Sequence, residues 1–162
     1  MNRFMLKYDV TKLRKGSEGV QDYVSAPSKA KIAFDKRQAE YKLDVAVIKE
    51  LMKKAKDYVI FVFSAEWCPD CVRNVPILGL IAESTGMEVR VFGHIMKDAE
   101  SNTRKWAVPP SPPEVEEFDV PKIPLIVILK KNGEKAGEIV ENPPPGKTLE
   151  QAILDVIKRP NF

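Results

Sequence analysis

The sequence predicts an α/β fold: a four-stranded mixed sheet flanked by helices, with an N-terminal helical extension. From residue 58 onward the expected order is strand, helix, strand, helix, strand, strand, helix. The run "YVIFVFS" (58–64) is apolar on both alternations, as in a strand that is covered on both faces. A strand–helix–strand unit followed by a hairpin and a last helix therefore indicates a mixed sheet with helices on both faces.

The first 57 residues predict an irregular arm followed by two helices. Residues 1–27 show little periodicity and are expected to form an irregular arm, and a helix is expected from Ser28, as N-cap, to about Leu43. Asp44 is expected to cap a second helix, whose apolar stripe follows helical spacing. That stripe consists of Val45, Ile48, Leu51, Met52 and Ala55. We place the domain boundary after residue 43, with an arm and helical extension at 1–43 and the main domain at 44–162.

The second half supplies the other elements of the sheet. "PLIVILKKNGEKAGEIV" predicts a hairpin around a "KNG" turn, and Thr148 with Gln151 forms a capping box for a last helix. The Pro-rich run at 108–117 is expected to be an ordered loop or a polyproline stretch. The remaining predictions are a helix at 72–85 with a kink at Pro76, a strand at 87–95 and a helix at 98–106.

Composition and charge argue against several functional classes. The 162 residues carry a net charge of +3, divided into +6 over residues 1–57 and −3 over residues 58–162. The basic residues alternate with apolar ones at helical spacing, which favours a solvated helix face over a nucleic-acid surface. The start lacks the apolar core of a secretory signal, and no stretch approaches ~20 apolar residues. We therefore expect a cytoplasmic protein with neither a membrane nor a nucleic acid as partner.

Both cysteines of the chain, Cys68 and Cys71, lie in "SAEWCPDCVRNVP" at the end of a predicted strand and the start of a predicted helix. The first thiol would lie at the helix N-terminus, where unpaired N–H groups and the helix dipole favour a thiolate. The second would lie one turn further on, close enough to form a disulfide with the first. This arrangement predicts a redox pair.

Two other interpretations of the pair stay open on the residues alone. A zinc site usually needs four ligands, and the chain offers two Cys and His94, so a partner chain would have to supply the rest. A permanent disulfide is typical of secreted proteins, and a ring this small adds little stability.

The stretches "FVFSAEWCPDC…P" and "FDVPKIPLIVILKKNGE" resemble the two active-site segments of the thioredoxin family. The resemblance covers about residues 43–160 and implies the thioredoxin-like fold. It implies that Cys68 is the exposed nucleophile and Cys71 the more buried resolving thiol. It also implies that Trp67 faces the substrate, that Pro124 is a cis-proline beside the disulfide, and that the backbone of Ile123 pairs with an extended substrate.

The sequence also departs from the commonest family pattern. Pro69 and Asp70 replace the usual Gly-Pro between the cysteines and would tune the redox centre, as in the subgroup with a "WCPDC" centre, which tends to act on narrower sets of substrates. The buried Asp of the family falls at Val62, and its accompanying Lys falls near Val91. If proton transfer at Cys71 is assisted, Glu66 and Asp70 are the nearest carboxylates in sequence.

We therefore predict a thiol–disulfide oxidoreductase that acts on disulfides in proteins or small thiol compounds. It would need no bound cofactor beyond the redox-active Cys68–Cys71 disulfide and no metal, and a partner reductase would supply electrons. The alternative is a non-catalytic redox-sensing or peptide-binding module of the same fold.

Overall fold

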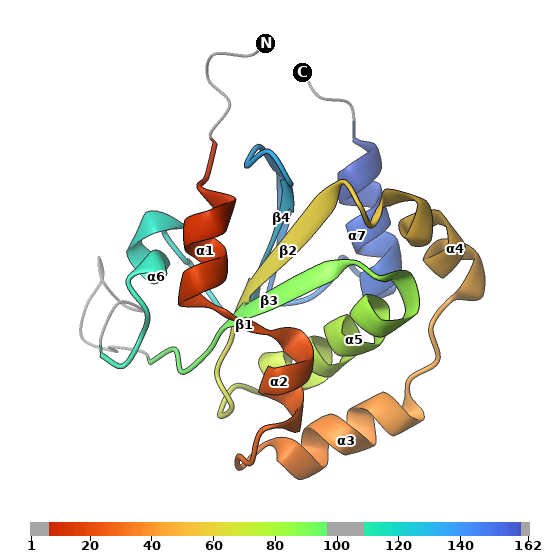
Figure 1. Cartoon of the computed structure of the whole chain (residues 1–162). Helices are drawn as coiled ribbons and strands as arrows, with labels where there is room; N and C mark the ends of the chain where they lie inside the picture. Colours follow the sequence, from red (N-terminus) through yellow and green to blue (C-terminus); the bar gives the residue numbers. More distant parts are fainter. Residues whose placement is uncertain (1–6, 97–108, 160–162) are drawn as a thin grey trace.

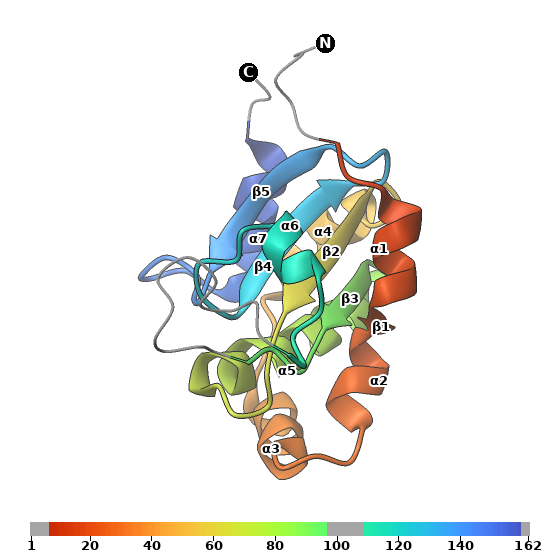
Figure 2. The same ribbon diagram turned by 90° about the vertical axis from the view of Figure 1, so that its left-hand side faces the viewer.

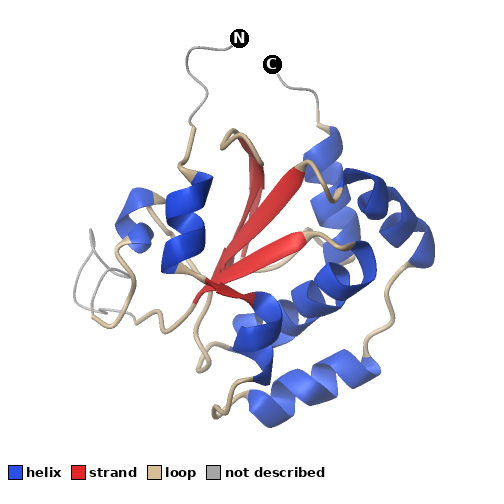
Figure 3. Ribbon diagram, in the orientation of Figure 1, coloured by secondary structure: helices blue, strands red, loops and turns tan. Residues whose placement is uncertain are grey.

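A mixed β-sheet forms the centre of the protein, with helices on both of its faces (Figures 1 and 3). The computed structural model describes residues 7–96 and 109–159. Within these ranges the chain forms five strands and seven helices. The strand order is β1-β3-β2-β4-β5, in which β2 and β3 are parallel and the other pairs are antiparallel. The strands are β1 (Glu18–Gly19), β2 (Tyr58–Phe63), β3 (Glu88–Phe92), β4 (Leu125–Lys130) and β5 (Lys135–Val140).

The helices form two layers. α4, α5 and α7 lie on one side of the sheet, and α1 and α6 lie on the other, in front of the strands in Figure 2. α2 and α3 pack against α5 at the lower end of the molecule in Figure 1. The helices are α1 (Val10–Gly16), α2 (Val20–Ser25), α3 (Lys31–Glu40), α4 (Val45–Lys54), α5 (Pro69–Thr85), α6 (Glu114–Glu117) and α7 (Leu149–Lys158). None of the helices in these ranges is long and apolar enough to cross a membrane.

The sheet has one strand more than the sequence predicts. The additional strand, β1, comes from the segment that was expected to be an irregular arm, and it pairs with the edge of β3. The Arg90 guanidinium fastens it there by donating to the Ser17 hydroxyl (2.9 Å) and the Ser17 carbonyl (2.7 Å). A strand of two residues is too short to show an alternating pattern in sequence.

The N-terminal segment also holds two short helices that the sequence analysis missed. Asp9 caps α1 by accepting from the Lys12 N–H (3.1 Å), and Val10 and Leu13 are buried. Helices of one or two turns repeat the apolar spacing too few times to be recognised. The next helix, α3, begins at Lys31 and not at Ser28, whose hydroxyl instead accepts from the Ala30 N–H (3.2 Å).

The stripe predicted for α4 is wrong at two positions. Asp44 caps the helix as expected, but Val45 and Met52 are exposed. Val47 is buried in their place, together with Ile48, Leu51 and Ala55. α4 packs against α5 and α7 together, and these two neighbours select a face that is turned relative to the predicted one.

Some of the other predicted elements are confirmed and others are not. The hairpin of β4 and β5 and the last helix are confirmed, with Thr148 accepting from the Gln151 N–H (3.1 Å). The Pro-rich run was expected to be non-helical, but its last residues form α6, directly after Pro113. Proline is tolerated where a helix begins because its missing N–H is not needed there. The helix predicted at 98–106 lies outside the described residues.

Polar side chains of the N-terminal segment bind backbone carbonyls of α5. Gln21 donates to the Gly79 oxygen (2.7 Å), Arg37 to the Arg73 oxygen (3.0 Å) and Gln38 to the Pro76 oxygen (3.0 Å). A Cβ at Gly79 would lie 2.8 Å from Nε2 of Gln38, so glycine permits this close approach. The part of this segment from Gln21 to Gln38 therefore makes specific contacts with the helix that begins at the cysteines.

Candidate active site

Cys68 lies at the N-terminus of α5, after the short loop that leaves β2. It is the N-cap residue, and its sulfur accepts from the Cys71 N–H (3.4 Å). Pro69 occupies the first helical position, where its fixed φ suits the helix. The first turn of α5 thus places both sulfurs together and directs an N–H group at Cys68.

The two thiols have opposite acidities. The pKa of Cys68 is lowered to about 7, mainly by the hydrogen bond from the Cys71 thiol and also by the backbone N–H groups of Cys71 and Asp70. Burial and the charge of Asp70 act in the opposite direction, but their effect is smaller. Burial raises the pKa of Cys71 far above that of an ordinary thiol, and its hydrogen bond to Cys68 raises it further. Near neutral pH the pair therefore holds one readily formed thiolate and one thiol.

Cys68 is less accessible than the family resemblance implies. Its exposed fraction is 6%, against 0% for Cys71, so the predicted order holds but both thiols are buried. Trp67 is 50% exposed beside them, and its indole N–H donates to the Ile95 carbonyl (3.0 Å). Trp67 also lines a pocket of about 390 Å³ together with Tyr23, Glu66 and His94.

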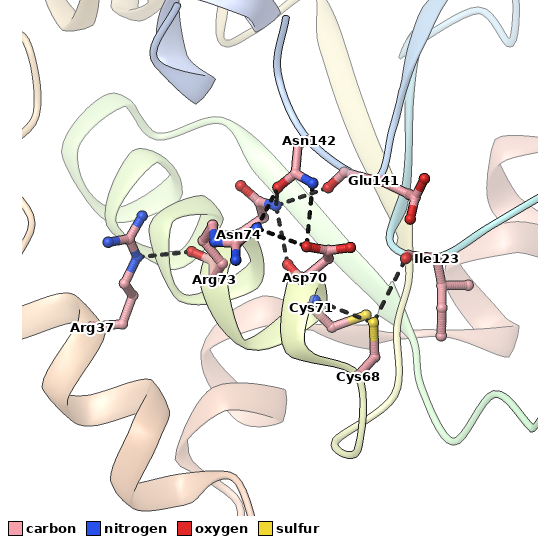
Figure 4. Close-up of polar contacts among 9 residues, drawn as sticks. All are labelled: Arg37, Cys68, Asp70, Cys71, Arg73, Asn74, Ile123, Glu141 and Asn142. Carbon is pink, nitrogen blue, oxygen red and sulfur yellow. Dashed lines mark hydrogen bonds and ion pairs between the residues drawn. The ribbon is translucent and has the colours of Figure 1, made fainter. Parts of the chain in front are cut away.

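The Ile123–Pro124 peptide bond is cis, which confirms the prediction for that bond. The bond precedes β4 and brings the Ile123 carbonyl oxygen to Cys68, whose thiol donates to it (3.6 Å; Figure 4). The Pro124 carbonyl accepts from the Glu141 N–H (2.8 Å), which fastens this segment to the end of β5. Segments more than 50 residues apart thus meet at one sulfur.

Asp70 lies in a hydrogen-bonded cluster that the sequence analysis did not find. Its Oδ1 accepts from Arg73 (2.7 Å) and from the Asn142 amide (3.2 Å), as Figure 4 shows. Asn74 donates to the Asp70 carbonyl (3.0 Å) and to the Glu141 carbonyl (2.8 Å). These contacts join the first turn of α5 to the loop after β5, and no local pattern indicates contacts between residues about 70 positions apart.

Valines occupy the two core positions behind the cysteines where the family resemblance places a buried Asp and its accompanying Lys. Val62 and Val91 are adjacent in the register of β2 and β3, and both are buried. Of the two carboxylates nearest in sequence, Asp70 is held by Arg73 and Asn142, and Glu66 lies 3.3 Å from the His94 ring. Within 7–96 and 109–159, no three His, Cys, Asp or Glu side chains gather to hold a metal ion.

Comparisons with known proteins agree with this geometry. The family model described as thioredoxin matches residues 18–154, and the chain belongs to this family. A protein of unknown function from Pseudomonas aeruginosa has the same fold at 20% identity and a TM-score of 0.64, with 93% of this chain and 95% of that chain covered. An HIV epitope scaffold matches at the same identity and TM-score, with 93% and 96% covered. No curated protein sequence matches the chain significantly.

Proposed function

We propose that the protein is a thiol–disulfide oxidoreductase with a Cys-Pro-Asp-Cys centre. The observation that supports this best is the pairing of Cys68, whose pKa is lowered to about 7, with the fully buried thiol of Cys71 at the same helix terminus. A thiol with a pKa near the ambient pH combines a large thiolate fraction with strong nucleophilicity. The pair then needs no bound cofactor, and the protein would act in the cytoplasm.

The reaction proceeds in two exchanges. The Cys68 thiolate attacks one sulfur of the substrate disulfide, and the other sulfur leaves as a thiolate. Cys71 then gives up its proton and attacks Cys68 in the mixed disulfide, which releases the second substrate sulfur. The substrate gains two electrons and two protons, the Cys68–Cys71 disulfide forms, and a partner reductase restores the dithiol.

The substrate surface we propose consists of Trp67, Ile123 and Pro124 around the sulfurs. The half-exposed indole and the neighbouring pocket offer apolar area, and the backbone of Ile123 would pair with an extended segment. The substrate is a disulfide in a protein or in a small thiol compound. Because the centre reads Trp-Cys-Pro-Asp-Cys, we place the chain with the narrow-specificity subgroup that this sequence resembles.

A second function is favoured by one observation, the 6% exposure of Cys68. A thiol this covered suits a redox-sensing or peptide-binding module that closes and opens its pair without turnover. Reduction of insulin by dithiothreitol distinguishes the two functions. We expect the protein to shorten the lag before insulin precipitates at catalytic concentrations. The sensing or binding module would instead be supported if the lag shortened only when the protein was equimolar with insulin, while the cysteine pair still oxidised reversibly.

Replacing Asp70 with asparagine should make the pair more oxidising. The Asp70 carboxylate raises the pKa of Cys68, so its removal should lower this pKa, stabilise the thiolate and with it the reduced form. Arg73 and Asn142 already offset part of the charge, so we expect the potential to rise by only ~10–50 mV. The measurements are titration in a glutathione redox buffer and the ultraviolet absorbance of the thiolate.

Arg73→Gln is the matched control for Asp70→Asn. It removes the cation that pairs with Asp70 at 2.7 Å, so the pKa of Cys68 should rise and the potential should fall. Equal shifts of the same sign in both variants would contradict an electrostatic role of Asp70. Such a result would indicate that the cluster acts by holding the loop after β5 in place.

A further inference from the structure

Two buried hydroxyl groups lie next to the resolving thiol. The Tyr23 and Ser64 hydroxyl oxygens are 3.0 Å apart, and Ser64 follows directly after β2. Ser64 has no exposed surface and Tyr23 has 4%. Backbone hydrogen bonds fix Ser64, whose N–H donates to the Phe92 carbonyl (3.0 Å) and whose carbonyl accepts from the Ile95 N–H (3.3 Å).

Ser64 of this pair is hydrogen-bonded to the Cys71 thiol. Burial raises the pKa of Cys71 and the Cys68 hydrogen bond adds to this rise, whereas a hydrogen bond from the Ser64 side chain lowers it. The neighbouring strand positions Val62 and Val91 offer no group that can take up a proton. Ser64 and Tyr23 therefore supply the buried polar side chains through which a proton can leave Cys71 on this side.

Tyr23 belongs both to the buried hydroxyl pair and to the lining of the pocket beside Trp67. It lines that pocket together with Glu66, Glu18 and His94. Burial raises the pKa of Tyr23 above its ordinary range, and the charges of Glu66 and Glu18 add to this rise, so the phenol stays neutral. A neutral hydroxyl both donates and accepts, which is the property that a proton relay requires.

We propose that Ser64 and Tyr23 form a hydroxyl relay that carries the proton of Cys71 to the pocket during the resolving step. The relay rests on the proposed function, because it serves the second of the two exchanges. Ser64 acts at the reacting sulfur, and Tyr23 acts through Ser64 as a positioning residue. Each hydroxyl gains one proton and loses another, so both are neutral before and after the step.

In the proposed step one proton leaves Cys71 while one disulfide bond forms and another breaks. The Cys71 proton passes to Ser64, the Ser64 proton passes to Tyr23, and the Tyr23 proton passes to solvent in the pocket. The Cys71 sulfur forms a bond to Cys68, and the bond between Cys68 and the substrate sulfur breaks. The leaving sulfur takes the electron pair, and the relay itself is neither oxidised nor reduced.

The relay also gives the N-terminal segment a direct role at the redox centre. Tyr23 belongs to α2, which precedes residues 43–160, where the sequence analysis placed the resemblance to thioredoxins. The fold leaves room for its ring, because a Cβ at Gly93 would lie 2.7 Å from Cε1 of Tyr23. The relay therefore exists only while α2 stays packed against the end of β3.

Dithiobis(nitrobenzoate), an aromatic disulfide, separates the two exchanges in a stopped-flow experiment. At stoichiometric reagent, the attack of Cys68 releases one coloured thiolate and the attack of Cys71 releases the second. In Tyr23→Phe and Ser64→Ala we expect the first release at the rate of the unmodified protein. The second release should slow roughly 10–100-fold. A positioned acid or base typically accelerates a reaction by about 100-fold or more, so this expected loss does not exceed the lower end of that range.

Tyr41→Phe is the matched control, because it also removes a phenol that is hydrogen-bonded inside the fold, here to Glu150 at 2.7 Å. Its two releases should match those of the unmodified protein. The double variant Tyr23→Phe/Ser64→Ala should be no slower than the slower single variant, because the hydroxyls act in series. Ser64→Ala keeps the test possible if Tyr23→Phe fails to fold.

Two readouts separate a relay from a merely structural role. The slowing should shrink as the pH rises, because hydroxide then takes the Cys71 proton directly. Cys68 lies beside Cys71, and the titratable groups that line the pocket with Tyr23 are Glu18, Lys29, Glu66 and His94. The solvent deuterium isotope effect on the second release should also change in Tyr23→Phe. An unchanged second release in both variants would overturn the relay, whereas a single release in the unmodified protein would overturn the proposed function and the relay with it.

Discussion

Cys71→Ser should trap the protein on its substrate through a mixed disulfide at Cys68, and Cys68→Ser should abolish disulfide reduction. The asymmetry follows from the thiol acidities, since the pKa of Cys68 is lowered to about 7 and that of Cys71 is raised by burial. In the proposed function, Cys68 therefore attacks at neutral pH and Cys71 resolves the mixed disulfide. Non-reducing electrophoresis and mass spectrometry of the trapped species measure the outcome.

The two variants control each other, because both remove one sulfur from the same helical turn. A mixed disulfide in Cys68→Ser, or residual reductase activity there, would contradict the assignment of the attacking thiol. Trapping by Cys71→Ser without turnover in the unmodified protein would support the sensing module. The exposed fraction of Cys68 is small, so bulky substrates should be trapped more slowly than small disulfides.

The sequence predicts the position of the cysteine pair because the pattern that indicates it is local. Cys68 and Cys71 are three residues apart, and a strand that ends just before them fixes their place at a helix terminus. The cis bond at Ile123–Pro124 was predictable from the second family motif. Arg73, Asn74 and Asn142 could not be predicted as a cluster, because their contacts depend on how the loop after β5 meets α5.

The N-terminal segment shows the same limit for the fold. Phe34 is fully buried and Ile32 is 83% exposed, although both are large apolar residues of one helix. The apolar spacing in α3 is too weak to show which face packs, and the choice is made by α5 and by Tyr23, whose ring lies 5.9 Å from that of Phe34. Tertiary contacts therefore determine the orientation of this helix.

Phe34→Ala should lower the free energy of unfolding by about 3–5 kcal/mol, the usual loss for a fully buried phenylalanine. Ile32→Ala, two residues away and exposed, should change it by less than about 0.5 kcal/mol. Urea unfolding followed by far-ultraviolet circular dichroism measures both. Alkylation of Cys71, which has no exposed surface in the folded protein, gives a second probe at the redox centre.

The two probes decide whether the N-terminal helices belong to the cooperative unit that holds the cysteines. Arg37 and Gln38 of α3 bind the Arg73 and Pro76 carbonyls of α5, the helix that carries both cysteines, so loss of α3 should loosen the first turns of α5. In Phe34→Ala, circular dichroism and Cys71 alkylation should therefore shift together to lower urea. A small stability loss, or alkylation that stays at the original urea concentration, would show that α3 folds independently of the redox centre.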